Sequence, residues 1–100
     1  DGNCGGSNQK KLLTLYRERS IFIACCLEKF GELSVEDLRK LGSSKRRTGT
    51  ILSANFYGWF DRVKRGWYSL SDEGKKALLT FSDTADFFRN KLKDIDKKPI

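Results

Sequence analysis

Apolar residues recur at spacings of three and four positions through the first third of the chain. Between residues 10 and 30 they include Tyr16, Ile23 and Leu27, and Gly31 follows as a stop signal. This periodicity is typical of an amphipathic helix. It predicts one long helix over about residues 10–30 that is largely buried in its second half.

Two shorter helices are predicted in the middle of the chain. Leu33 is a candidate for a short sheet contact, and the following Ser-Val-Glu-Asp segment, residues 34–37, approximates a capping box. The second helix is therefore expected over residues 35–41, before Gly42. A third helix is expected over about residues 45–55, with Ser43 or Ser44 as its cap.

The third predicted helix has two distinct faces. Thr48, Ile51 and Leu52 share one side, which we expect to be buried, while basic and hydroxyl side chains occupy the others. Gly49 weakens this helix by about 1 kcal/mol relative to alanine. A glycine inside a helix can indicate that another backbone or a ligand approaches closely at that position.

Alternation with period two begins after Gly58. It predicts two strands, over residues 59–63 and 67–70, joined by a Lys-Arg-Gly turn. Ser71 is placed to cap a helix over residues 72–81, and Ser82 or Asp83 to cap a last one. The order helix, short strand, helix, helix, hairpin, helix predicts a mostly helical α+β fold, the winged helix-turn-helix.

The predicted organisation is one domain with short additions. Residues 1–9 contain three glycines and no aliphatic side chain, which indicates a flexible linker. The winged-helix domain is expected over residues 10–81, an additional C-terminal helix over 82–96 and a frayed tail over 97–100. The linker composition and the lack of methionine favour a piece of a longer protein.

The positive charge is concentrated in the middle of the chain. The formal net charge is +7, and residues 39–66 hold eight basic side chains against Asp61 alone. This stretch includes the third helix and the hairpin, the two elements with which winged helices contact DNA. The predicted nucleic-acid contacts are Lys45, Arg46, Arg47, Thr50, Asn55, Arg62, Lys64 and Arg65.

The predicted partner is nucleic acid, with duplex DNA as the expected form. The basic residues would neutralise phosphates, and Thr50 and Asn55 would reach bases or sugars. Two alternatives remain. The chain could dock on a protein or dimerise through a partly exposed aromatic hairpin around Trp59 and Trp67, or the charge could form only a solvated face. The aromatic residues favour core packing over base stacking, with Trp67 partly exposed.

No catalytic, metal or cofactor site is predicted from the residues themselves. The chain has no histidine and no nucleophile and base at usable spacing, so we expect that it is not an enzyme. Its cysteines, Cys4, Cys25 and Cys26, lack the paired spacing of a zinc site. We expect the last two to be inert core residues and Cys4 to be an exposed thiol.

The longest apolar run, residues 21–27, is too short to span a membrane, and the N-terminus does not have the pattern of a signal peptide. A cytoplasmic protein without membrane association is therefore expected.

Several motifs resemble one known family. They are Gly5-Gly6-Ser7, Arg47-Thr48-Gly49-Thr50-Ile51-Leu52, Asn55-Phe56-Tyr57-Gly58-Trp59-Phe60, Arg62-Val63-Lys64-Arg65-Gly66, Tyr68-Ser69-Leu70 and Gly74. Over about residues 5–80 they resemble the C-terminal region of a bacterial family of uncharacterised proteins described as putative PD-(D/E)XK phosphodiesterases. The resemblance implies a preceding nuclease-like domain that carries the metal-binding catalytic residues. The present chain would then position DNA, or pack on that domain as an accessory module.

Overall fold

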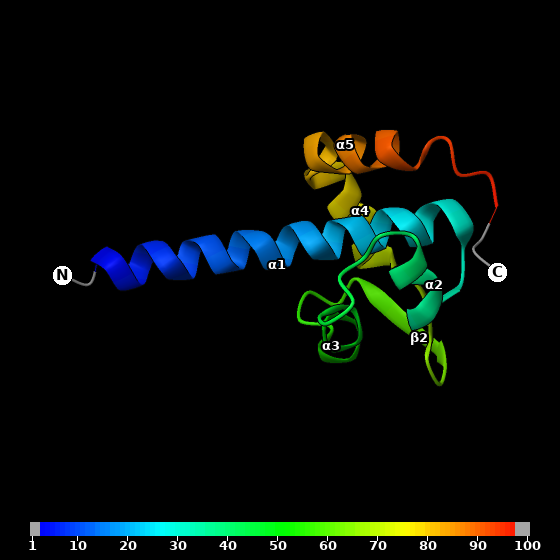
Figure 1. The fold of residues 1–100 in the computed structure, drawn as a ribbon, viewed down its shortest axis with the longest axis horizontal. Helices are drawn as coiled ribbons and strands as arrows, with labels where there is room; N and C mark the ends of the chain where they lie inside the picture. Colours follow the sequence, from blue (N-terminus) through cyan, green and yellow to red (C-terminus); the bar gives the residue numbers. More distant parts are fainter. Residues whose placement is uncertain (1–2, 98–100) are drawn as a thin grey trace.

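The structure is a computed structural model that describes the backbone of residues 3–97 and the side chains of residues 14–97. It confirms a mostly helical α+β fold with the elements in the predicted order (Figure 1). The elements are α1 (Asn3–Phe30), β1 (Leu33–Ser34), α2 (Val35–Lys40), α3 (Thr48–Ala54), β2 (Phe60–Lys64), β3 (Trp67–Leu70), α4 (Asp72–Thr80) and α5 (Ser82–Leu92).

The first helix is longer than predicted. It begins at Asn3, so residues 3–9, which we expected to be a linker, are helical, and residues 1–2 lie outside the described part. Each residue added to an existing helix forms one more hydrogen bond and requires no new nucleation step. This gain offsets the low helix propensity of the glycines. Figure 1 shows this end of α1 projecting beyond the other elements.

Other element boundaries also differ from the prediction. The third helix begins at Thr48, because residues 45–47 form a turn before it. The last helix ends at Leu92 instead of residue 96. The tail predicted over residues 97–100 falls mostly outside the described residues, which end at Lys97.

The elements form two layers on either side of α1. The three strands make an antiparallel sheet in the order β1-β3-β2, which lies with α2 and α3 on one side of α1 (Figure 1). Helices α4 and α5 lie on the other side. Helix α1 contacts α3, β3, α4 and α5. It is the element through which the two layers are joined.

The core is built around the second half of α1. Consecutive residues of this helix are buried on more than one face, as expected of a helix that is covered on both sides. They are Ser20, Ile21, Ile23, Ala24, Cys25, Cys26 and Leu27. Leu33, Leu38, Leu52, Leu78 and Leu92 supply the surrounding layers. Among the described residues, no helix is long and apolar enough to cross a membrane.

The two core cysteines are unpaired thiols. Cys25 and Cys26 are both at most 1 % exposed, which confirms their predicted place in the core. Burial raises the pKa of each thiol to about 12. Burial therefore disfavours the thiolate, which is the reactive form of each group. The side chain of Cys4 lies outside the described region.

Side-chain caps fix where α2 and α4 begin. Ser34 Oγ accepts a hydrogen bond from the Asp37 amide at 3.1 Å, and Asp37 Oδ2 accepts one from the Ser34 amide at 3.3 Å, which confirms the predicted capping box. Ser71 Oγ accepts from the Gly74 amide at 3.1 Å and donates to the Gly58 carbonyl at 2.7 Å. The second cap thus joins α4 to the loop that follows α3.

An ion-pair cluster attaches α5 to α1. Arg89 donates from Nε and Nη2 to the two carboxylate oxygens of Glu28, at 2.8 and 2.9 Å, and from Nη1 to Asp86 at 2.9 Å. The hydrogen bonds to both carboxylates raise the pKa of the guanidinium. Fork-shaped pairing of this kind fixes orientation as well as distance.

A pair of glycine substitutions tests the packing at α4. The Cβ of an alanine at Gly74 would overlap the Trp59 carbonyl oxygen and the Leu70 side chain, whereas at Gly49 the nearest described atom is Arg39 Nη2 at 3.9 Å. We expect Gly74→Ala to lower the free energy of unfolding by about 2 kcal/mol and Gly49→Ala to raise it by about 0.5–1 kcal/mol. Urea denaturation of both variants measures this. Equal effects from the two substitutions would show that Gly74 is not packed as described.

Candidate nucleic-acid interface

Three exposed basic residues precede α3. We call Lys45, Arg46 and Arg47 the loop cluster. None of them forms an ion pair with a described residue. Their charges are therefore available to an anion brought to this surface.

Hydroxyl groups hold the backbone of this loop. The Ser43 and Thr48 hydroxyls hydrogen bond to each other, and Thr48 also donates to the Ser44 carbonyl. Ser44 Oγ accepts from the Arg47 amide at 3.1 Å. Ser43 and Thr48 are buried, so the loop cluster stands on a fixed base. The predicted cap Ser44 thus stabilises the turn, and Arg47 is the residue at the N-cap of α3.

The buried face of α3 is the predicted one, with Thr48, Ile51 and Leu52 at most 2 % exposed. Thr50 is exposed on the other side. No backbone of another described element lies close to Gly49. The close backbone approach suggested by this glycine is therefore not observed among the described residues.

Asn55 has a structural role that the sequence did not indicate. It terminates α3 in a left-handed conformation with φ of 47°. Its side-chain amide donates to the Phe60 carbonyl at 2.8 Å and accepts from the Phe60 amide at 3.2 Å. Both polar ends of the side chain are therefore engaged in joining α3 to β2, and we leave Asn55 out of the proposed contact surface.

The second basic group lies on the hairpin. We call Arg62, Lys64 and Arg65 the wing cluster; all three are exposed. The strand register is interrupted between Arg62 and Lys64, which pair with consecutive residues of β3 and leave Val63 as the extra residue. A bulge of this kind increases the local twist at the end of the hairpin. The Lys64 amine lies 5.0 Å from the centre of the Trp67 ring.

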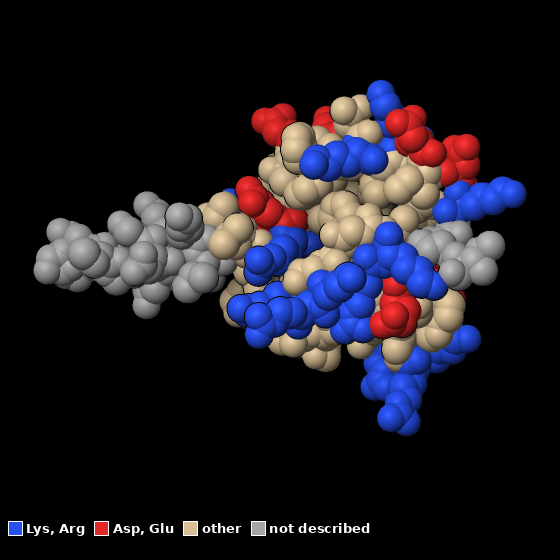
Figure 2. Space-filling model, viewed as in Figure 1, with Lys and Arg blue, Asp and Glu red and all other residues tan. Residues whose placement is uncertain are grey.

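The loop cluster and the wing cluster contribute to one face of the protein. Figure 2 shows lysine and arginine side chains gathered over the segment before α3 and at the end of the hairpin, with acidic side chains between the two groups. The positive surface is thus divided in two. A partner that spans both groups must be extended.

The aromatic residues of the hairpin pack mostly inward. Trp59, Phe60 and Tyr68 are buried and Trp67 is half-buried, in agreement with the predicted core packing. Trp59 stacks on Tyr57 with ring centres 4.4 Å apart. Trp59 therefore does not belong to an exposed apolar patch, whereas Phe56 before it and Val63 after it in the chain are exposed.

An apolar groove, which was not predicted from the sequence, lies beside the loop cluster. Leu15, Tyr16 and Arg19 of α1 line it together with residues of the α3 region: Arg47, Thr50, Ile51, Ala54 and Phe56. Phe56 is 72 % exposed, and its ring meets Tyr16 edge to face. Arg19 was missed because residues 1–38 carry a net charge of −1, which hides a single cation that the fold brings beside α3.

Acidic side chains are scattered over the described part of the chain. Among the described residues, no three histidine, cysteine, aspartate or glutamate side chains are placed to hold a metal ion. The described residues therefore do not form a metal site, and the resemblance places the metal-binding residues in a preceding domain.

Comparison with known proteins assigns the chain to a family. The family described as "Putative PD-(D/E)XK phosphodiesterase (DUF2161)" matches residues 1–77, and the chain belongs to it. The match includes both basic clusters and ends within α4. No curated protein and no solved structure shows significant similarity to the chain.

Family membership corrects one expectation from the residues. We expected that the chain is not an enzyme, because no nucleophile, base or metal-binding motif is recognisable in the sequence. The family is described by a phosphodiesterase activity, which points toward an enzyme, so that expectation is wrong. It failed because it considered only the chemistry that short motifs can reveal.

The position of Asn55 gives a second prediction. Asn55→Gly keeps the left-handed backbone accessible but removes both hydrogen bonds to Phe60, so we expect a loss of about 1–2 kcal/mol in unfolding free energy. Duplex DNA affinity should stay within about twofold of that of the original chain. Thermal denaturation and fluorescence anisotropy measure the two effects. If the variant is as stable as the original chain but binds DNA more weakly, Asn55 contacts the nucleic acid and this interpretation is wrong.

Proposed function

We propose that this chain binds duplex nucleic acid as a winged-helix module and positions it for the phosphodiesterase activity of its family. The observation that carries the proposal is the loop cluster, in which three adjacent cations without ion-pair partners among the described residues stand on a hydrogen-bonded turn. The hydrogen-bonded turn fixes the backbone positions from which these three side chains extend. Duplex DNA presents regularly spaced phosphates to such a surface.

The division of the positive surface favours an extended partner. In a winged helix bound to DNA, the second helix of the helix-turn-helix enters the major groove, and the wing contacts the flanking backbone. Helix α3 with the loop cluster corresponds to the first contact, and the wing cluster to the second. The acidic side chains between them disfavour a compact anion that would cover the whole face (Figure 2).

Mainly phosphate contacts are expected, with limited reading of bases. Thr50 and Ser53 are the exposed polar residues of α3, and their side chains are short. Ser53 Oγ also donates to the Thr50 carbonyl at 3.3 Å. The arginines next to α3 can reach phosphates, which fix position without reading sequence. We therefore propose binding with little sequence preference.

A charge-reversal experiment tests this surface. The variant Arg46→Glu, Arg47→Glu, Lys64→Glu changes both clusters, and we expect it to weaken binding of a random duplex by at least about 100-fold at about 0.1 M salt. The control variant Lys75→Glu, Lys93→Glu, Lys97→Glu makes the same change in net charge at other exposed positions. It should stay within about fivefold of the original chain, because charges beyond about 10 Å are screened.

Anisotropy titration measures both affinities, and thermal denaturation checks that both variants fold. The proposal is wrong if the first variant binds as tightly as the original chain. It is also wrong if the control loses as much affinity as the first variant, since net charge alone would then explain binding.

A further inference from the structure

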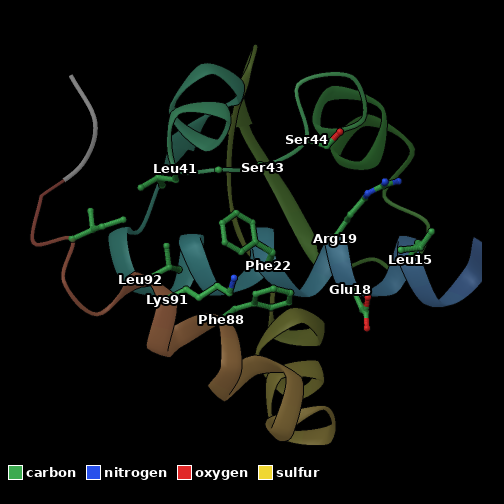
Figure 3. A pocket seen from close by; sticks show the side chains of 12 residues that line it. Leu15, Glu18, Arg19, Phe22, Leu41, Ser43, Ser44, Phe88, Lys91 and Leu92 are labelled. Carbon is green, nitrogen blue, oxygen red and sulfur yellow. The ribbon is translucent and has the colours of Figure 1, made fainter.

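A second hollow lies between the two layers, beside α1. It has a volume of about 500 Å³ and is formed by α1, α5 and the loop between α2 and α3 (Figure 3). This volume is within the range of small-molecule sites in proteins, about 300–1,000 Å³. Neither the nucleic-acid interface nor the core accounts for it.

The interior of this pocket is apolar. Phe22 of α1 and Phe88 of α5 face each other edge to face, with ring centres 5.3 Å apart. Leu41, Leu92 and Ile95 add aliphatic surface around them. Figure 3 shows Phe22 and Phe88 at the centre of the hollow, with Leu41 above and Leu92 beside them. An aromatic or branched apolar group would replace water there favourably.

One side of the pocket carries an unpaired cation. Arg19 lies on α1 one turn before Phe22, and Figure 3 shows its guanidinium directed away from Phe22 and Phe88, toward the end of the pocket near Ser44. It forms no ion pair with a described residue. Glu18 also borders the pocket, but Figure 3 shows its carboxylate directed to the opposite side of α1 from Arg19. Lys91 is a second cation on the rim, with its amine 4.9 Å from the centre of the Phe87 ring.

Few other polar groups are available to a ligand. The Ser43 hydroxyl is hydrogen bonded to Thr48, and the Ser44 hydroxyl accepts from the Arg47 amide. A ligand with many polar atoms would therefore lose its hydration without replacement. A ligand with an apolar body and one anionic group matches the site, since a guanidinium binds a carboxylate through two hydrogen bonds.

We propose that this pocket binds a small amphipathic carboxylate, with its apolar part on Phe22 and Phe88 and its carboxylate on Arg19. The proposal does not depend on nucleic-acid binding. Ser43 and Ser44, which line the pocket, directly precede the loop cluster in the chain.

The test uses 2-naphthoate as the probe and 2-naphthalenemethanol as its neutral counterpart. Each is titrated into the ¹⁵N-labelled chain while amide shifts are followed by NMR. We expect saturable binding of 2-naphthoate at about 1 mM or tighter. The largest shifts should fall on Leu41, Phe88 and Lys91, which line this pocket and not the groove beside α3.

Arg19→Gln should weaken 2-naphthoate binding by at least about fivefold and leave the affinity for the neutral probe within twofold. Arg17→Gln is the matched control on the same helix, because Arg17 lies over Phe81 at 5.0 Å and does not line the pocket. It should bind both probes like the original chain. The proposal is overturned if 2-naphthoate does not saturate by about 10 mM, if the shifts fall elsewhere, or if Arg19→Gln leaves its affinity unchanged.

Discussion

The burial of α1 on both sides is the constraint on which the other features depend. From Ser20 to Leu27 this helix is covered by the sheet and α3 on one side and by α4 and α5 on the other. Each large apolar side chain buried there contributes about 1.5–3 kcal/mol relative to exposure. Both layers pack on this helix, and α4 also contacts the sheet side directly, where Gly74 packs against Trp59 and Leu70. The loop cluster, the wing cluster and the pocket are therefore all held in place by packing against the same element.

A basic surface needs a rigid base if its charges are to meet phosphates at fixed spacing. In this protein buried hydroxyls supply the base of the loop cluster, and the Asn55 amide fixes the path from α3 to the hairpin. The polar groups that hold the surface are thus different from the charged groups that it exposes. We therefore expect reversal of the exposed charges to change stability little, and removal of the polar groups below them to lower it.

Much of the fold follows from local signals in the sequence. The spacing of apolar residues gave the helices, and the glycine turn between two alternating segments gave the hairpin. The capping box at Ser34 and the cap at Ser71 set two helix starts correctly. Three results could not be predicted locally. They are the extension of α1 to Asn3, the turn at residues 45–47 in place of helix, and the double hydrogen bond of Asn55 with Phe60.

The candidate site was predicted by charge, and the pocket was not predicted at all. Arg19 belongs to a segment of slightly negative net charge, so composition gives no reason to single it out. Its significance depends on Phe88 and Leu41, which come close to it only in the folded chain. The phosphodiesterase family was recognised from sequence motifs, whereas the chemistry of the residues had led us to expect that the chain is not an enzyme.

The most direct test of nucleic-acid docking is the salt dependence of duplex binding. The association constant of this chain for a random duplex is measured by anisotropy between about 50 and 200 mM salt. If the six basic residues of the two clusters each neutralise a phosphate, the logarithm of that constant falls with the logarithm of salt concentration with a slope near about −5. A slope close to zero, or no binding at the lower salt, would contradict the account.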